Sequence, residues 1–414
     1  ALGTAVVRKN RPSHSKFRPA RTGPRPTHTM ESPRGETASA GMTQDNQGTW
    51  NSKTQTFHGG QDWAHLSNFK EDFSVTTNGL GTPVGALEAA TKAVQHIRHY
   101  PPSDFEPALT GLARFLWPDG GACLEHKDLL TLGNGASELI DLVVRSAKPG
   151  KWRPGPQHTQ YKEYKRSALA AGFSTTAPSD REATLLCVVN PTNPTGDYWN
   201  LAEIKAYLEE KCDRGSTVIV DESMQPWLGP EWREDSLIGQ RAWARQMSEE
   251  RGVDVWVMTS WTKIWSCPGI RLGSAVAPTK ALMDSVKAKQ VPWSVNCMAL
   301  DFLSAVVKDE EYMRQTWELT PRWNREMRAA LAAHHPGWTV HGKEFLSWLW
   351  IDTKDEALAA EAVRLAREAG LPLRSGAPGY NLPTYFRAAV RDEQKWNALL
   401  AALAPLEGAA GRAG

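Results

Sequence analysis

The sequence has few cysteines, almost no excess of charge and no long hydrophobic segment. Its five cysteines are scattered, without a CxxC pair or a His/Cys cluster, so we expect no metal site, no disulfide framework and a reducing compartment. The formal net charge of +2 gives no electrostatic reason to bind nucleic acid. The longest apolar runs, such as TLLCVVN and STVIVDE, are only strand-sized, so no membrane span is predicted.

The rest of the composition is that of a globular protein with more than one domain. Apolar residues make up 41% of the chain and charged residues 23%, as in ordinary folded proteins. A chain of 414 residues exceeds a typical domain, so we expect a large core domain and a smaller one. The 18 tryptophans are unusually many, and we interpret them as packing residues.

Residues 1–56 differ in composition from the rest of the chain. This segment is rich in Arg, Pro, Ser, Thr and Gly, and it has few acidic residues and no periodic apolar pattern. It is therefore predicted to be a disordered basic extension. It is either an organelle transit peptide or sequence upstream of a true start at Met30 or Met42. An organelle is the expected location in the first case, and the cytoplasm in the second.

Beyond this segment the apolar pattern becomes periodic. An N-terminal arm is predicted over 57–85. Strand-length apolar runs then alternate with helical stretches over 86–300, which predicts a large α/β domain with a mostly parallel sheet. The helix and strand pattern over 301–414 predicts a smaller α+β domain. The first predicted helix, GALEAATKAVQHIRHY, has its apolar residues at helical spacing, namely Leu87, Ala90, Val94 and Ile97.

Polar residues follow four of the predicted strands at the point where each ends. LLTLGNG runs into ASE, TLLCVVN into PTNPTG, STVIV into DES, and VDVWVMTS into WTK. Because ligands bind beyond the carboxyl ends of the strands in doubly wound sheets, these four ends are predicted to meet at one site. The residues that would meet there are Ser137, Asn193, Asp221, Ser260, Thr262, Lys263 and Arg271.

Some of these residues have a simpler interpretation when taken alone. Asn193 lies in a turn-forming stretch, Asp221 is suited to cap a helix, and Lys263 is long enough to reach solvent. Together they form the set that pyridoxal 5′-phosphate requires. A desolvated lysine forms a Schiff base with its aldehyde, and a carboxylate keeps its ring nitrogen protonated. Hydroxyls, an arginine and a helix N-terminus hold its phosphate.

The order and spacing of three motifs resemble those of a known family. NPTNPTG, VDES and SWTKIWSCPGIRLG occur in this order, with Arg271 eight residues after Lys263. From His58 to about Leu403 the chain resembles fold-type I pyridoxal-phosphate enzymes of the class I/II aminotransferase superfamily. The resemblance implies an α/β fold, with a mostly parallel sheet in the large domain and a smaller α+β C-terminal domain. It also implies pyridoxal 5′-phosphate as the cofactor and a small amino-acid substrate.

Within this superfamily the chain is most similar to threonine-phosphate decarboxylases, and next to histidinol-phosphate aminotransferases. The opening HGG, the stretch DFSVTTNGLGTP, the Pro-Gly before Arg271, and the stretches PWSVNCMAL and LPTYFRAAVRD resemble the decarboxylase branch. This implies a lyase that decarboxylates an O-phosphorylated amino acid through a Lys263 Schiff base, in a cobalamin pathway. The alternative is an aminotransferase acting on histidinol phosphate or another amino acid. A third interpretation is a non-catalytic ligand-binding module, but such copies often lose the lysine or the aspartate, and Lys263 and Asp221 are both present.

The resemblance implies a role for each matching residue. Lys263 is the expected Schiff-base lysine, Asp221 the partner of the ring nitrogen, and Tyr161 the ring that stacks on the cofactor; these three are the expected catalytic residues. The cofactor is expected to be held by Ala136, Ser137, Asn193, Asp221, Ser260, Thr262, Lys263 and Arg271, and by Tyr100 of the neighbouring subunit in a homodimer. The substrate is expected to contact Arg387, Arg374, Asn78 and His58.

The predicted substrate wall departs from the family pattern. Met224 occupies the position three residues after the aspartate, where the family usually has Tyr or Phe. Thr76 and Gly79 replace an Asn and a Pro of the decarboxylase opening, and Glu344 replaces a substrate-side Asn. The cofactor set is intact and the substrate wall is altered, so a changed substrate specificity is consistent with the sequence.

Overall fold

The computed structural model describes residues 58–177 and 182–407. All of them belong to one compact unit that spans 48–414. The predicted basic extension, 1–56, lies outside the described residues.

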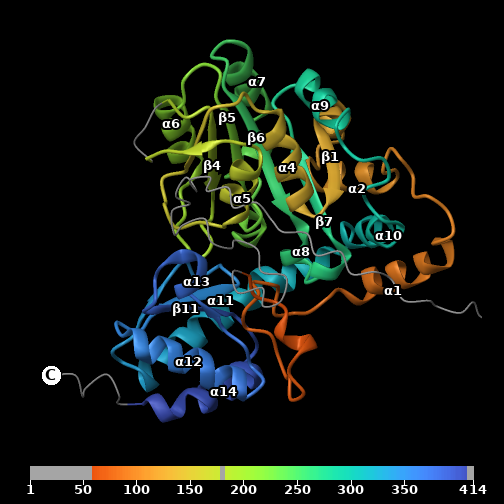
Figure 1. Cartoon of the computed structure of the whole chain (residues 1–414). Coiled ribbons are helices and arrows are strands. Elements are labelled where there is room, and N and C mark those ends of the chain that lie inside the picture. Colours follow the sequence, from red (N-terminus) through yellow and green to blue (C-terminus); the bar gives the residue numbers. More distant parts are fainter. Residues whose placement is uncertain (1–57, 178–181, 408–414) are drawn as a thin grey trace, which may run out of the picture. The chain divides into compact units, whose positions relative to one another are not determined.

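The larger of two sheets has seven strands in the order β1-β7-β6-β5-β4-β2-β3 (Figure 1). Strand β7 runs antiparallel to its neighbours β1 and β6, and the pairs from β6 to β3 are parallel. The predicted α/β fold with a mostly parallel sheet is therefore confirmed. The strands are β1 (Leu130–Asn134), β2 (Lys151–Pro154), β3 (Ser174–Thr175), β4 (Leu185–Val189), β5 (Thr217–Asp221), β6 (Asp254–Ser260) and β7 (Leu272–Val276).

Helices cover both faces of this sheet, because its buried strands send alternate side chains to opposite sides. In β5, Val218 and Val220 join one hydrophobic cluster, and Ile219 joins the other. The first cluster includes side chains of α2, α6 and α7, and the second includes side chains of α4, α5 and α9. The helices of this part are α2 (Ala108–Leu116), α3 (Gly120–His126), α4 (Ala136–Ser146), α5 (Glu163–Ala170), α6 (Leu201–Lys211), α7 (Arg241–Glu249), α8 (Trp261–Ile264) and α9 (Lys280–Lys287).

The C-terminal part is built on a four-stranded antiparallel sheet in the order β10-β11-β9-β8. It has its own hydrophobic cluster, in which strand residues such as Ile351 and Phe386 pack with helix residues such as Leu399. We call this part the small domain. Its elements are α11 (Glu310–His334), β8 (Thr339–His341), β9 (Trp348–Asp352), α12 (Glu356–Glu368), β10 (Arg374–Ser375), α13 (Ala377–Tyr380), β11 (Tyr385–Ala389) and α14 (Glu393–Leu403).

Helix α1 (Val84–Ala93) buries a different face from the one the sequence indicates. Of the predicted apolar positions only Ala90 is buried, while Leu87, Val94 and Ile97 are 50%, 49% and 64% exposed. The helix packs on α10 (Cys297–Val306) through its alanines, because small side chains allow two helices to lie close together. The predicted domain boundary at 300–301 falls inside α10.

Residues 58–83 form the N-terminal arm that precedes α1, and the arm is bonded to the small domain. The backbone N–H of Ala389 donates to the carbonyl oxygen of Phe73 at 2.8 Å. Arg391 donates through Nη1 to the carbonyl oxygen of Thr77 at 2.8 Å and through Nη2 to that of Asp72 at 2.6 Å. These bonds satisfy a buried guanidinium, which is 2% exposed, so the arm and the small domain are joined by well-placed polar contacts.

The described residues lack two further features. None of the helices there combines the length and apolarity needed to cross a membrane. Within the same residues, no three His, Cys, Asp or Glu side chains are grouped so as to hold a metal ion.

Candidate active site

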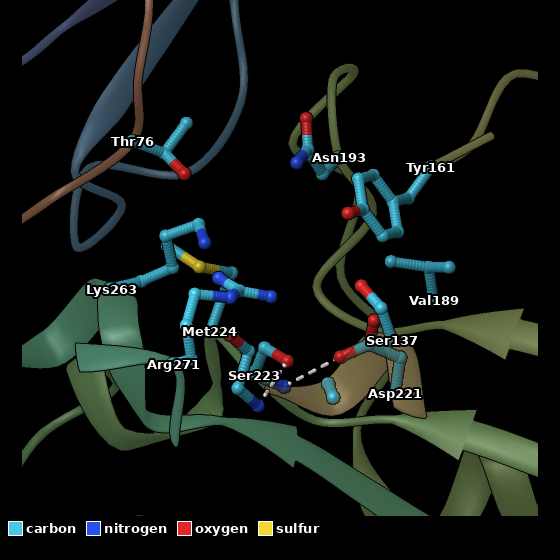
Figure 2. A pocket seen from close by; sticks show the side chains of 12 residues that line it. Thr76, Ser137, Tyr161, Val189, Asn193, Asp221, Ser223, Met224, Lys263 and Arg271 are labelled. Carbon is cyan, nitrogen blue, oxygen red and sulfur yellow. Dashed lines mark hydrogen bonds between the residues drawn. The ribbon is translucent and has the colours of Figure 1, made fainter. Parts of the chain in front are cut away.

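A pocket of about 570 Å³ lies at the carboxyl ends of β4, β5 and β6 and at the start of α4. Figure 2 shows Lys263 and Arg271 on one side of the pocket and Tyr161 and Val189 on the other. The strand ends therefore converge as the sequence predicts. The predicted residues that line this pocket are Ala136, Ser137, Tyr161, Asn193, Asp221, Ser260, Lys263 and Arg271.

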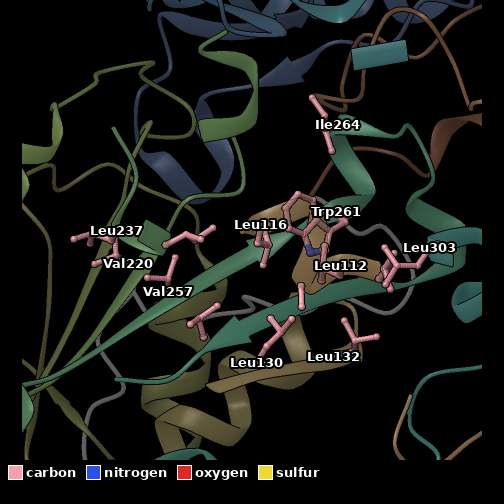
Figure 3. Close-up of a cluster of buried hydrophobic side chains, with 14 of the residues drawn as sticks. Leu112, Leu116, Leu130, Leu132, Val220, Leu237, Val257, Trp261, Ile264 and Leu303 are labelled. Carbon is pink, nitrogen blue, oxygen red and sulfur yellow. The ribbon is translucent and has the colours of Figure 1, made fainter. Parts of the chain in front are cut away.

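Lys263 is presented to the pocket by the short helix α8, directly after β6. Trp261 and Ile264, on either side of it, are fully buried in the core cluster (Figure 3). Its Nζ donates to Thr262 Oγ1 at 3.0 Å. Burial, with a contribution from the nearby charge of Arg271, lowers the pKa of Lys263 to about 8. A substantial fraction of this amine is therefore neutral near physiological pH, as a nucleophilic lysine requires.

Asp221 ends β5 and is 7% exposed. Its Oδ2 accepts a hydrogen bond from the Tyr164 hydroxyl at 2.8 Å, and its Oδ1 accepts one from the backbone N–H of Ser223 at 2.8 Å. Burial raises the pKa of Asp221, while these hydrogen bonds and the charge of Lys263 act in the opposite direction. Its carboxylate is thus fixed in orientation beside the pocket, with lone pairs left for a ligand.

The start of α4 and the side chain of Arg271 form a site suited to an anion. Gly135 precedes the helix with φ at 75°, and a Cβ placed there would lie 2.3 Å from Arg271 Nη2. A glycine is needed at this position, because a side chain would be strained and would displace the guanidinium. The first N–H groups of α4, together with Ser137 and Ser260, complete a cradle of donors around Arg271.

Thr262 contacts two of the pocket residues, Ser260 and Lys263, through its side chain. Its side chain is buried and does not line the pocket. Its Oγ1 lies 2.9 Å from Ser260 Oγ and accepts the bond from Lys263. The structure therefore places Thr262 as a support for two residues that face the pocket.

Tyr161 and Asn193 lie on the side of the pocket opposite Lys263 (Figure 2). Burial raises the pKa of the Tyr161 phenol, so the ring stays neutral. Its ring makes an edge contact with Tyr164, with centroids 6.2 Å apart. The amide oxygen of Asn193 accepts a hydrogen bond from Arg387 Nη1, which leaves its amide nitrogen free to donate.

The pocket continues into a wider cavity of about 1920 Å³ between the N-terminal arm and the small domain. Arg374 and Arg387 line it, only 5% and 6% exposed, and they face each other as paired residues of β10 and β11. Arg387 Nη2 donates to the carbonyl oxygen of Ser74 at 2.6 Å. Its buried Nε has no partner among the described residues. Burial, with a contribution from Arg374, lowers the pKa of Arg387 to about 10.

The remaining predicted residues lie in different surroundings. His58 lines the wider cavity, and its Nε2 is 3.0 Å from Glu163 Oε1. Asn78, predicted to lie against the substrate, lines neither cavity. Its amide nitrogen donates to the carbonyl oxygen of Ile264 at 3.0 Å and to Thr316 Oγ1 at 2.8 Å, so it holds the α8 segment in place.

Tyr100 and Glu344 lie away from both cavities. Tyr100 is 78% exposed and stacks on Trp293 with ring centroids 4.4 Å apart. It is therefore not part of the pocket within this chain. Glu344 forms an ion pair with Arg325 at 3.3 Å, so the family's substrate-side Asn has no counterpart here.

Several residues near the pocket were not predicted as site residues, and they include Val189, Ser223 and Met224 of its lining. Thr76 lines both cavities, and Figure 2 shows it on the arm above Lys263. Tyr164, behind the pocket, bonds Asp221. Tyr161 precedes α5 and Tyr164 is the second residue of the helix, so helical spacing gave no signal for the second tyrosine.

The pocket residues fit pyridoxal phosphate. An amine with a lowered pKa, a buried carboxylate with open lone pairs and a cradle of anion donors surround one cavity. They match an aldehyde, a ring nitrogen and a phosphate, respectively.

Comparison with known sequences gives matches over most of the chain. The family model described as aminotransferase class I and II matches residues 70–403. Histidinol-phosphate aminotransferase 2 of Ralstonia nicotianae is 26% identical over 350 residues, covering 79% of this chain and 86% of that protein. Threonine-phosphate decarboxylase of Salmonella typhimurium is 25% identical over 358 residues, covering 80% of this chain and 90% of that protein.

Solved structures share the fold. The histidinol-phosphate aminotransferase from Clostridium acetobutylicum aligns with a TM-score of 0.68 and 22% identity, covering 82% of this chain and 100% of that chain. The enzyme of the same name from Sinorhizobium meliloti, in complex with pyridoxal-5′-phosphate, aligns with a TM-score of 0.66 and 18% identity, covering 82% of this chain and 90% of that chain.

Proposed function

The chain belongs to the class I and II aminotransferase family, and from this premise we propose that it decarboxylates an O-phosphorylated amino acid. The resemblance predicted from the three motifs is confirmed by the family match. Enzymes of this family depend on pyridoxal phosphate, so the chain is a pyridoxal-phosphate-dependent enzyme. Decarboxylation and the identity of the substrate are the parts that we propose.

The pair of buried arginines, Arg374 and Arg387, is the observation that supports this proposal. Two guanidiniums stand on adjacent strands in one cavity, each at most 6% exposed. Charges buried so close together are stable when anions neutralise them. An O-phosphorylated amino acid carries a carboxylate and a phosphate on one small molecule, and therefore supplies one anion for each arginine.

The side chains of the pocket suit this reaction. The bound cofactor supplies an aldehyde that captures an amine and a ring that accepts the electrons of the bond that breaks. Lys263 offers a neutral amine to the pocket and moves protons there, Asp221 keeps a negative charge beside the ring, and the free Nε of Arg387 orients the carboxylate.

A second candidate is an aminotransferase that acts on histidinol phosphate or another amino acid. It is favoured by the relatives, because among eight curated relatives of strong similarity seven carry the name histidinol-phosphate aminotransferase and one the name threonine-phosphate decarboxylase. The same pocket serves both reactions, since they differ in which bond to the α-carbon breaks.

One assay separates the two candidates. The purified enzyme, loaded with pyridoxal phosphate, is incubated with threonine phosphate in the absence of any oxo acid. Release of carbon dioxide with formation of an amine supports the decarboxylase. A strict requirement for an oxo-acid acceptor, with histidinol phosphate as the amino donor, contradicts it and supports the aminotransferase.

We also propose that the enzyme is a homodimer formed through the surface around α1. Large apolar side chains are exposed there, including Val84 at 71%, Ile97 at 64% and Tyr100 at 78%, with Trp293 stacked on Tyr100. A cluster of this kind is typical of a contact surface. Sedimentation should give twice the chain mass, and the double change Leu87→Glu with Ile97→Glu should give monomers. A wild-type monomer at micromolar concentration would contradict the proposal.

A further inference from the structure

Tyr164 links the two residues that face the cofactor from the side opposite Lys263. It is completely buried as the second residue of α5, three positions after Tyr161, which precedes the helix. Its hydroxyl donates to Asp221 Oδ2 at 2.8 Å, and its ring meets the Tyr161 ring edge-on at an interplanar angle of 79°. A single side chain thus contacts both the carboxylate and the stacking ring.

The Tyr164 bond acts on a carboxylate that is difficult to keep ionised. Asp221 is 7% exposed, and burial disfavours its charged form. Burial also raises the pKa of the Tyr164 phenol well above its ordinary value, so this hydroxyl remains a donor at every working pH. A donor that cannot lose its proton favours the ionised form of its acceptor.

Other charged and titratable groups also act on Asp221. Lys263 on α8 favours its ionised form through its positive charge. Glu222, the next residue in the chain, and Cys187 on β4 interact with it as acids, as do the two phenols. The Tyr164 hydroxyl and the backbone N–H of Ser223 donate to its side-chain oxygens, and the side chain of Ser223 also favours the ionised form through a hydrogen bond. Substitution of Tyr164 therefore removes one donor and leaves the two donors of Ser223 in place.

We propose that Tyr164 is a positioning residue that keeps Asp221 ionised and oriented toward the ring nitrogen of the cofactor. The inference rests on the proposed use of pyridoxal phosphate at this pocket. It adds a residue to the site that does not touch the cofactor and acts through Asp221. Tyr164 also packs edge-on against the ring of Tyr161, the residue expected to stack on the cofactor.

Tyr164→Phe is the test, because it removes the hydroxyl and keeps the ring. The matched control is Tyr198→Phe, which removes a tyrosine hydroxyl bonded to Asp235 away from both cavities. Losing one hydrogen bond to a charged group is expected to raise the dissociation constant for pyridoxal phosphate about tenfold and to lower kcat about tenfold, with KM changed less than about threefold. The control should leave all three values near those of wild type.

The pH dependence of activity is a second measurement that tests the proposal. Asp221 must be ionised to act, so activity falls as the pH drops through its pKa, and this acidic limb should lie at higher pH in Tyr164→Phe than in wild type. The apo protein provides a reading without the cofactor. The pKa of Asp221 is higher in the folded than in the unfolded protein, so the free energy of unfolding declines as the pH rises through the folded pKa. In Tyr164→Phe the folded pKa should be higher still, and the decline should end at a higher pH.

The possible outcomes separate a failure of the Tyr164 inference from a failure of the proposed function. If Tyr164→Phe matches wild type in cofactor affinity, kcat and acidic limb, the inference is wrong and the proposed function stands. If it differs from wild type only in melting temperature, Tyr164 has a structural role alone and the inference is wrong. If wild-type protein binds no pyridoxal phosphate, the proposed function fails, and the apo unfolding series still reports whether Tyr164 shifts the pKa of Asp221.

Discussion

Arg387, on a strand of the small domain, donates a hydrogen bond to the amide oxygen of Asn193, in the loop that follows β4 of the large sheet. The residue expected to bind the substrate is therefore bonded to the residue expected to contact the cofactor. Trp348 reinforces the contact, since its Nε1 donates to the carbonyl oxygen of Pro194 at 2.7 Å. The small domain and the loop after β4 are thus joined by one bond between two side chains and one bond from a side chain to the backbone.

Arg387→Lys should separate substrate binding from cofactor binding. Lysine keeps the positive charge but cannot serve Asn193, Ser74 and a carboxylate together. We expect kcat/KM to fall about 10- to 100-fold, mainly through KM. Steady-state kinetics with the exposed Arg322→Lys as control measure the effect. An unchanged KM would show that the carboxylate binds elsewhere.

Capture of the cofactor by apo protein should depend on pH through Lys263. Its pKa of about 8 lies below that of an exposed lysine, and the neutral amine is the reactive form. The rate of cofactor capture, followed by absorbance, should therefore rise with pH and level off above about 8. Lys263→Ala should show no covalent capture, and borohydride followed by mass spectrometry should find no modification in the peptide. A rate that still climbs at pH 10 would contradict the lowered pKa.

Asp221→Asn should lower activity and stabilise the apo protein at neutral pH. The folded pKa of Asp221 is raised, so its stabilising, protonated form is present at low pH and is lost as pH rises through that pKa. Asparagine carries no charge that burial would penalise. The free energy of unfolding of the variant should therefore exceed that of wild type by an amount that grows with pH. Denaturant unfolding at several pH values measures it, while kcat should fall by more than KM changes. A variant that is equally destabilised at every pH would count against this account.

Gly135→Ala should weaken cofactor binding without unfolding the protein. The positive φ strains any side chain there, and the new Cβ would push Arg271 Nη2 out of the cradle. We expect the dissociation constant for pyridoxal phosphate to rise about tenfold, as measured by fluorescence titration. Gly120→Ala on α3 is the control, because nothing lies within 4 Å of a Cβ placed there. Equal affinities in the two variants would remove the case for the cradle.

The parts of the site that could be predicted from the sequence are those set by the sheet. Strand runs such as STVIV end in polar residues, and a parallel sheet brings its carboxyl ends together, so Asp221, Lys263 and Asn193 could be placed at one edge. Arg271 follows from its spacing to Lys263. These positions depend on backbone topology, which the alternation of strands and helices reveals.

The parts that could not be predicted depend on how elements pack. Periodicity placed Leu87 on a buried face of α1, but the close approach to α10 selects Ala86 and Ala93 instead. Asn78 is drawn into bonds with Ile264 and Thr316, partners distant in sequence. Tyr164 gains its role only because α5 places it over the end of β5. A pattern within one segment carries no information about such distant neighbours.

The bonds from Arg391 to the arm have a mechanical consequence. Because Arg391 bonds the carbonyl oxygens of Thr77 and Asp72, a shift of the small domain would move Thr76 of the arm together with Arg374 and Arg387. The spacing between these three residues, which line the wider cavity, is therefore kept by the bonds between the arm and the small domain.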